Sequence, residues 1–285
     1  MQKPLNFGRL VRLRGLQLKT MLWNATRQLA SACCLNCKHL LKTNALEKSQ
    51  VLCSYCEQLH QTSLLNSRPN CLRCSLPFTL SVNGDDENGL KDNYLDTLMC
   101  ADCQKDPFSF DRCIAAAAFE GIPAQLVKHL KHRAKTSAAI FMAEQICAAV
   151  ELRIPAYKTS LAVDCLIPVP MHLSRFRQRG FNQAELIAAS VSRALLIPVD
   201  NKACKRIQTT NAQQLLNRRE RKKNLQNAFE ISATALAGKR IAIIDDVVTT
   251  GETANQLALA ILKTGALHCE VWCYARTGKP NDNLA

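Results

Sequence analysis

The sequence predicts an α/β protein: a parallel β-sheet flanked by helices, with a small metal-binding module on its N-terminal side. Three observations predict this class. Continuous apolar runs such as residues 241–244 are typical of strands buried on both faces, as in parallel sheets. From residue 113 onward, helical patterns alternate with these runs. Before residue 113, cysteines recur in Cys-x-x-Cys pairs, a spacing typical of metal-binding turns.

Composition limits the class of protein further. With 285 residues, of which 47% are hydrophobic, the chain is long enough for one large domain and a smaller one. No apolar run approaches the ~20 residues of a membrane-spanning helix, so we expect no membrane span. The formal charge of +14 indicates attraction to phosphorylated ligands or polyanions. The 15 cysteines, without a secretory signal, favour metal binding in a reducing cytoplasm over disulfides.

Three regions divide the chain. Residues 1–32 contain six basic residues and no acid, which predicts a loosely ordered basic arm; an organelle transit peptide is the alternative. Residues 33–112 form the predicted Cys-rich module, similar to a double zinc ribbon. Residues 113–285 form the predicted α/β domain.

Four Cys-x-x-Cys pairs carry the metal prediction. The tight turn of each pair directs two thiolates toward one ion, and two pairs complete the tetrahedral shell of Zn²⁺. Pairing in chain order gives two Cys₄ sites, and interleaved pairing stays open. Closed Cys₄ sites are structural, so we expect two structural Zn²⁺ ions and a module that needs them to fold. The eight predicted ligands are Cys34, Cys37, Cys53, Cys56, Cys71, Cys74, Cys100 and Cys103.

The α/β pattern from residue 113 predicts each element in turn. Strands are expected at 113–119, 161–169, 241–244 and 267–275, and helices at 122–132, 137–153, 184–195 and 254–263. Prolines and Gly180 predict a rigid loop between residues 168 and 183, on which Arg179 can hold phosphate oxygens. Residues 205–223 carry many more bases than acids and predict a long mobile loop or hairpin that acts as a lid; a solvated basic face is the alternative.

Residues 241–253 are the stretch around which this domain is organised. The buried strand ends in Asp245 and Asp246, at the edge of an α/β sheet where ligands bind. Small hydroxylated residues and Gly251 follow, and a helix begins at Thr253. The helix N-terminus favours a phosphate, and the aspartates can accept hydrogen bonds from sugar hydroxyls or hold hydrated Mg²⁺. No Gly-Lys-Ser/Thr follows, so nothing indicates a Walker A loop or ATP hydrolysis.

The same stretch resembles the phosphoribosyl pyrophosphate (PRPP) signature of type I phosphoribosyltransferases: an apolar run, two acids, two apolar residues and Thr-Thr-Gly-x-Thr. A polar turn after a buried strand is the alternative interpretation. The resemblance implies that PRPP binds together with Mg²⁺. The PRPP-binding residues are then Asp245, Asp246, Val247, Val248, Thr249, Thr250, Gly251, Glu252 and Thr253, to which we add Lys131 and Pro170.

A wider set of motifs, from Cys34 to Arg276, resembles the ComF family of bacterial competence and DNA-utilisation proteins, the group that includes ComFC and GntX. The resemblance implies a type I phosphoribosyltransferase-like parallel sheet behind an N-terminal zinc-binding module, in a bacterial cytoplasm. It also implies a role in DNA uptake or in the use of DNA as a nutrient. Besides the Cys-x-x-Cys pairs and the PRPP signature, the motifs are Leu130-Lys131, Pro168-Val169-Pro170, Arg179-Gly180-Phe181-Asn182-Gln183-Ala184 and Arg218-x-x-Arg221-x-x-Asn224-Leu225-x-x-Ala228-Phe229.

Two functions remain open. In the first, the protein transfers a phosphoribosyl group, with Asp245, Asp246 and Arg179 as the catalytic residues. In the second, the same pocket only binds PRPP or a nucleotide, and the protein is a non-catalytic zinc-containing factor that engages DNA, the DNA-uptake machinery or helicase-like proteins. Thr249 favours the second, because purine-salvage phosphoribosyltransferases commonly carry an acid there that acts as a base. Aromatic residues are only 5% of the chain, so we expect DNA binding to be weak, sequence-independent and sensitive to salt.

Overall fold

The computed structural model describes residues 33–41, 51–65, 69–78, 98–133, 136–154, 163–207, 228–232 and 236–278. The chain divides into two compact units, Met1–Glu57 and Gln58–Ala285. The second unit therefore contains both the sheet and the later half of the Cys-rich region. This division differs from the predicted boundary between residues 112 and 113, and the three predicted regions stay a prediction.

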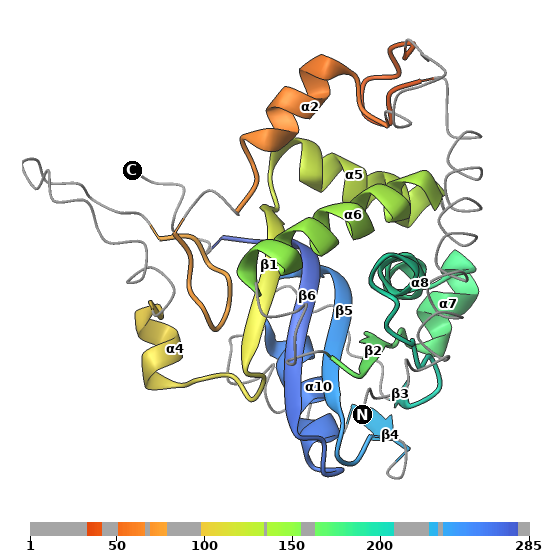
Figure 1. Ribbon diagram of the computed structural model, residues 1–285. Helices are drawn as coiled ribbons and strands as arrows, with labels where there is room; N and C mark the ends of the chain where they lie inside the picture. The colour runs from red at the N-terminus through yellow and green to blue at the C-terminus, as the bar shows by residue number, and fades with distance from the viewer. Residues whose placement is uncertain are drawn as a thin grey trace, which may run out of the picture. The chain divides into compact units, whose positions relative to one another are not determined.

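A four-stranded parallel sheet forms the centre of the second unit (Figure 1), with the strand order β1-β6-β5-β2. Its strands are β1 (Arg112–Ala118), β6 (His268–Arg276), β5 (Arg240–Val248) and β2 (Cys165–Pro168). β5 lies between β6 and β2, and its apolar run at 241–244 is fully buried. An unbroken apolar run suits such an inner strand, because both of its faces are covered. The predicted parallel sheet is confirmed.

The outer edge of β1 is covered by the chain itself. Leu64 bridges Ala117 in antiparallel orientation, and the N–H of Leu65 donates to the carbonyl of Ala116 at 3.0 Å. An uncovered edge strand would expose unpaired backbone groups to another chain. Residues 63–65 therefore protect this side of the sheet.

Helices cover both faces of the sheet, as predicted. α6 (Thr136–Arg153) and α8 (Gln183–Leu195) pack on one face, with α5 (Gly121–Arg133) beside α6, and α10 (Glu252–Leu262) lies behind the sheet in Figure 1. Ile241 and Ile243 of β5 share a buried cluster with Leu257 of α10. Ala242 and Ile244 point to the opposite face, because side chains alternate along a strand.

Residues 173–179, expected in a rigid loop, instead form helix α7 (Leu173–Arg179). The prolines end at Pro170, so nothing within this stretch breaks a helix. The His172 side chain accepts the N–H of Ser174 at the start of α7. Gly180 ends the helix in the left-handed conformation, with φ 80°, where glycine is favoured.

The predicted lid loop is only partly within the described residues. Its first residues belong to β3 (Cys204–Arg206), which pairs antiparallel with β4 (Phe229–Ile231), as in the hairpin that the sequence also allowed. Residues 208–227 lie outside the described residues, and so do the basic arm at 1–32 and the family motif at 218–227.

Two short helices, α2 (Ser54–Gln61) and α4 (Ala101–Lys105), occur in the Cys-rich region. Within the described part of the chain, no helix is long and apolar enough to cross a membrane. The cysteines of the α/β region are buried among apolar side chains, as predicted for small core residues. They are Cys113, Cys147, Cys165, Cys204, Cys269 and Cys273.

His60 and Tyr274 form a buried polar contact in the second unit. Nε2 of His60 lies 2.8 Å from Oη of Tyr274, and His60 is only 1% exposed. The ring of Phe141 packs edge-on against the imidazole, with ring centroids 5.1 Å apart. Burial lowers the pKa of His60 from 6.5 to about 4, so the imidazole is neutral at pH 7.

We predict that His60 makes folding stability fall as the pH is lowered from 6.5 to about 4. In this window the unfolded chain takes up a proton that the folded imidazole does not, so the free energy of unfolding decreases by up to roughly 1.4 kcal/mol per pH unit. Urea unfolding across this range measures the slope. His60→Gln keeps a polar partner for Tyr274 but cannot titrate, and should show a shallower slope. Equal slopes in both proteins would contradict the prediction.

Candidate functional site

Two aspartates lie at the carboxyl end of β5, where the predicted ligand site was placed. Oδ1 of Asp245 accepts the N–H of Asp246 at 2.9 Å, and Oδ1 of Asp246 accepts the N–H of Val247 at 2.9 Å. These bonds fix the direction of both carboxylates. The second oxygen of each carboxylate can then meet other partners.

Lys131 of α5 reaches the same point. Its Nζ lies 3.0 Å from Oδ2 of Asp246, which is 8% exposed. The pKa of Asp245 lies well above its ordinary range, chiefly because the protein shields this carboxylate from water and further because Asp246 is negatively charged. A cation or several hydroxyl donors between the two carboxylates would offset both effects. The site is therefore suited to Mg²⁺ or to a sugar.

The loop after β5 has the geometry of a phosphate-binding turn. Gly251 is the N-cap of α10, with φ 81° and ψ −8°. Thr249 and Thr250 are exposed, and Thr253 is half-buried. The first N–H groups of a helix have no intrahelical acceptor, and the helix dipole favours an anion there. An anion at this turn would meet backbone N–H groups and threonine hydroxyls together.

Glu252 is the exception among the residues of this loop. Its side chain is buried, and Oε1 accepts a hydrogen bond from Nε2 of Gln256 at 2.8 Å. The carboxylate is therefore held inside α10 and is not offered to a ligand. Its N–H remains part of the turn, beside Oγ1 of Thr250 at 3.4 Å.

The segment after β2 lies beside the same edge of the sheet. The N–H of Val169 donates to the carbonyl of Ile244 at 2.9 Å, and Nδ2 of Asn182 donates to the carbonyl of Val169 at 3.1 Å. These bonds hold Pro170 next to the carboxyl end of β5. The sequence-predicted residues Lys131 and Pro170 are thus brought to this edge together with the aspartates.

Arg179 is engaged elsewhere. Its Nη1 donates to Oε1 of Gln183 at 3.0 Å. Among the described residues, no hydrogen bond or ion pair joins Arg179 to Asp245 or Asp246. Its predicted catalytic role stays a prediction.

The charge of Arg206 acts on the site from a segment that the sequence placed in a mobile loop or hairpin. Burial lowers the pKa of Arg206, the positive charge of Arg175 lowers it further, and the negative charge of Asp245 acts in the opposite direction. Arg206 therefore lies within electrostatic reach of Asp245. Its guanidinium carbon is 5.8 Å from the ring centroid of Phe229 on β4. No local motif marks this arginine, because only the pairing of β3 with β4 positions it.

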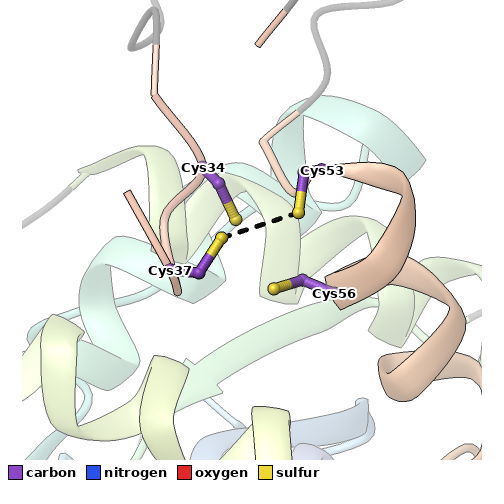
Figure 2. A group of neighbouring side chains, drawn as sticks. All are labelled: Cys34, Cys37, Cys53 and Cys56. Atoms are coloured by element: carbon purple, nitrogen blue, oxygen red, sulfur yellow. Dashed lines mark hydrogen bonds between the residues drawn. The ribbon is translucent and has the colours of Figure 1, made fainter. Parts of the chain in front are cut away.

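Two groups of four cysteines could each hold a metal ion. In each group the four sulfurs lie within 4.8 Å of one another. Figure 2 shows the sulfurs of the first group converging on one point. Of the pairings that the sequence left open, the structure has the one in chain order. The first group is Cys34, Cys37, Cys53 and Cys56, and the second is Cys71, Cys74, Cys100 and Cys103.

The separations between the sulfurs fit a tetrahedral metal. Sγ of Cys37 and Sγ of Cys53 are 3.6 Å apart, and Sγ of Cys74 and Sγ of Cys100 are 3.7 Å apart. Four metal–sulfur bonds of about 2.3 Å in tetrahedral geometry separate the sulfurs by about 3.8 Å. A disulfide needs about 2.05 Å. The residues present therefore fit a Cys₄ metal site.

The two groups repeat one local structure. Lys38 and Ser75, which directly follow the first cysteine pair of each group, have positive φ angles of 66° and 57°. Their N–H groups donate back to the carbonyls of Cys34 at 3.1 Å and Cys71 at 2.8 Å. Side chains rarely adopt this backbone unless the surroundings impose it. The same turn therefore recurs in both groups, each of which could hold a metal ion.

The thiols of the second group shift one another's pKa values in opposite directions. The pKa of Cys71 is lowered, chiefly by hydrogen bonds from Cys103 and Cys74. The pKa of Cys103 is raised by its contacts with Cys71 and Cys74 and by burial. A divalent cation would allow all four sulfurs to be thiolates at once.

Comparison with known proteins shows the family. The chain is 31% identical to "DNA utilization protein YhgH" of Shigella flexneri over 227 residues, which cover 79% of this chain and 90% of that protein. It is 31% identical to "Competence protein F" of Haemophilus influenzae over 179 residues, which cover 62% of this chain and 78% of that protein. The chain belongs to the ComF family of competence and DNA-utilisation proteins. No protein-family model matches it.

Among solved structures, the chain is similar to a purine phosphoribosyltransferase from Pyrococcus horikoshii, with 22% identity, a TM-score of 0.30 and coverage of 51% of this chain and 75% of that chain. An adenine phosphoribosyltransferase from Thermoanaerobacter pseudethanolicus gives 14% identity, a TM-score of 0.32 and coverage of 51% and 80%. TM-scores this low do not establish a common fold. The fold of this chain is defined by its own strand pairing and by the packing of its helices on the sheet.

Gly251 and Gly180 allow a matched test of how the loop is packed. Their φ angles are 81° and 80°, with ψ −8° in both. A Cβ at position 251 would lie 2.9 Å from Cζ of Phe108, whereas a Cβ at position 180 would meet nothing within 4 Å. We predict that each alanine variant loses about 1 kcal/mol to the left-handed backbone. Gly251→Ala should lose ~1–3 kcal/mol more, because the ring of Phe108 must shift.

Urea denaturation of the two glycine variants measures this difference. The loss in Gly180→Ala gives the cost of the backbone conformation alone, so subtracting it isolates the contact with Phe108. Equal losses in the two variants would show that Phe108 does not constrain the loop.

Proposed function

We propose that this protein binds PRPP with Mg²⁺ at the carboxyl end of β5 and acts in DNA uptake or in the use of DNA as a nutrient. The first half of the proposal is carried by the ion pair of Lys131 with Asp246, at the end of the strand that leads into the Gly251 turn and α10. The names of the relatives, a DNA-utilisation protein and a competence protein, support the second half.

In this proposal, different residues bind the phosphate, the ribose and the pyrophosphate of PRPP. Backbone N–H groups of residues 250–253 and the hydroxyls of Thr249, Thr250 and Thr253 would bind the 5′-phosphate. Asp245 and Asp246 would accept hydrogen bonds from the ribose hydroxyls, which are strong because the acceptors are charged. Lys131 would place its ammonium beside these groups and the pyrophosphate. Mg²⁺ would be bound largely through phosphate oxygens and water.

Phosphoribosyl transfer is the catalytic version of this proposal. The bond between ribose C1 and the pyrophosphate oxygen breaks while an acceptor atom forms a new bond to C1 and gives up its proton. In the transition state, positive charge develops on the ribose and negative charge on the leaving pyrophosphate. Basic side chains at the site lower that barrier electrostatically. Lys131, which pairs with Asp246, and Arg206, which lies within electrostatic reach of Asp245, would serve this task, whereas Arg179 would first have to leave Gln183.

Thr249 supports a second, non-catalytic candidate function. It is exposed on the loop where a base toward the acceptor would stand, and a threonine hydroxyl does not accept a proton at neutral pH. In this version the protein binds PRPP or a nucleotide as a zinc-containing accessory factor. Release of pyrophosphate from PRPP, measured with a panel of bases and with or without single-stranded DNA, distinguishes the two candidates. Release that depends on an acceptor supports the enzyme, and its absence in a protein that binds PRPP supports the accessory factor.

We propose a reducing bacterial cytoplasm as the site of action, because none of the fifteen cysteines forms a disulfide and eight of them could hold a metal ion. The net charge of +14 supports weak, salt-sensitive contact with DNA phosphates. Most bases of the 205–223 segment, among them Arg218, Arg219, Lys222 and Lys223, lie outside the described residues. Contact with DNA-uptake or helicase-like proteins stays a proposal drawn from the family.

The aspartates provide the direct test of ligand binding. We predict that Asp245→Asn combined with Asp246→Asn weakens Mg²⁺–PRPP binding at least tenfold, because each charged acceptor contributes ~1–3 kcal/mol. Isothermal calorimetry measures the affinity. Asp164→Asn is the matched control, because Asp164 accepts the N–H of Arg240 at the amino end of the same sheet. Unchanged affinity in the double variant would refute the site.

We also propose that each cysteine group holds one structural Zn²⁺, and we predict about two Zn²⁺ per chain in freshly purified protein. Cys34→Ser and Cys100→Ser should each lower the content by one ion and destabilise the chain, because a Cys₄ site contributes folding free energy. Cys147→Ala, a buried cysteine outside both groups, should keep two ions. Elemental analysis by mass spectrometry decides the matter, and a folded protein without zinc would contradict the prediction.

A further inference from the structure

We propose that Arg276 couples the second cysteine group to the ligand loop after β5. With a metal bound, the group fixes the carbonyl of Cys74, and Arg276 links that carbonyl to those of Val248 and Thr249, where the loop begins. Arg276 is then a positioning residue for the ligand site. The inference rests on the proposed function only in assigning PRPP to the loop.

The side chain of Arg276 connects the two places directly. Arg276 is the last residue of β6 and pairs with Val248, the last residue of β5. Only 4% of its surface is exposed. Its Nε donates to the carbonyl of Cys74 at 2.8 Å. Its Nη1 donates to the carbonyl of Val248 at 3.2 Å, to that of Thr277 at 2.9 Å, and to that of Thr249. Burying a guanidinium costs free energy unless its N–H groups find acceptors. The four carbonyls therefore stabilise the buried position of the Arg276 side chain together.

A second connection runs through the segment between α4 and β1. α4 carries Cys103, and Phe108 follows it in the chain with its ring against Gly251. The N–H of Ser109 donates to Oδ1 of Asn255, in the first turn of α10, at 2.7 Å. The segment that follows Cys103 thus contacts the start of α10, while Arg276 binds Val248 and Thr249 just before it.

The cysteine group is itself fixed to the sheet. Oγ of Ser75 donates to the carbonyl of Cys113 at 2.7 Å and accepts the N–H of Ala115 at 3.2 Å. Ser75 holds the positive φ of 57° that follows the cysteine pair, a conformation that a serine leaves readily when it is not imposed. Loss of the metal would release this turn, and with it the Cys74 carbonyl that Arg276 binds.

Hydrogen–deuterium exchange of the full chain tests the coupling without a ligand. Arg276→Lys keeps the charge, but its single ammonium cannot span acceptors on two sides. We expect two amides that are hydrogen-bonded to the loop to exchange about tenfold faster, the ratio that corresponds to ~1.4 kcal/mol. They are those of Asn255 and Thr277, which donate to the carbonyls of Gly251 and Val248. Cys100→Ser should accelerate the same amides at least as much, because loss of the metal would also loosen the segment between α4 and β1. The combined variant should go no further than Cys100→Ser alone, because loss of the metal already breaks the connection through Arg276.

Two controls match these variants. Cys37→Ser removes a ligand of the first group, which belongs to the other compact unit, and should leave the loop amides at the wild-type rate. Arg112→Lys alters an arginine at the opposite end of the sheet, where Nη2 pairs with Glu270 at 2.8 Å, and should also leave them unchanged. If Arg276→Lys does not fold, a second experiment uses the Cys37→Ser protein, in which only the second cysteine group is intact. Removing its metal with a chelator should then speed up the exchange of the loop amides.

Three results would overturn the proposal: unchanged loop exchange in Arg276→Lys, additive effects of Arg276→Lys and Cys100→Ser, or equal acceleration of amides in α6, which would indicate global unfolding.

Titration with Mg²⁺–PRPP separates this inference from the proposed function. If the wild type binds no PRPP, the proposed function fails and the exchange result still stands. If the wild type binds PRPP and Arg276→Lys binds it equally well, the positioning role of Arg276 fails.

Discussion

The burial of β5 between β6 and β2 is the constraint on which the rest of the second unit depends. Parallel pairing places the carboxyl ends of these strands at one edge of the sheet. Residues that are far apart in the sequence therefore lie at this one edge of the sheet. They are Asp245, Asp246, the turn at Gly251, Pro170 after β2 and Arg276 at the end of β6. The apolar side chains that bury β5 thus determine where its polar residues can act.

The two cysteine groups share a local structure but are integrated differently. Both place a left-handed residue after the first cysteine pair and a short helix at the second pair. The first group lies in the unit Met1–Glu57, whereas Cys71, Cys74 and Cys103 join the buried cluster that contains Ile243. A metal at the second group would stabilise the α/β core as well as its own turn. Metal binding and ligand binding are, in our proposal, linked through that shared core.

Sequence alone predicted the features that depend on local patterns. The apolar run of β5, its terminal aspartates and the Cys-x-x-Cys turns are each contained in a few consecutive residues. Contacts between distant segments could not be predicted: the pairing of the cysteine turns in chain order, Arg206 near Asp245, and Arg276 between Cys74 and Val248. The packing of Phe108 and Phe110, which join the later half of the Cys-rich region to the core of the sheet, is another such contact.

The most direct test of the central claim is a crystal structure of the protein with Mg²⁺ and PRPP. The account predicts density for the 5′-phosphate at the N–H groups of residues 250–253. It also places the ribose hydroxyls within hydrogen-bonding distance of Asp245 and Asp246. PRPP bound at another edge of the sheet, or a phosphate held only by surface lysines while the Gly251 turn stays empty, would contradict it.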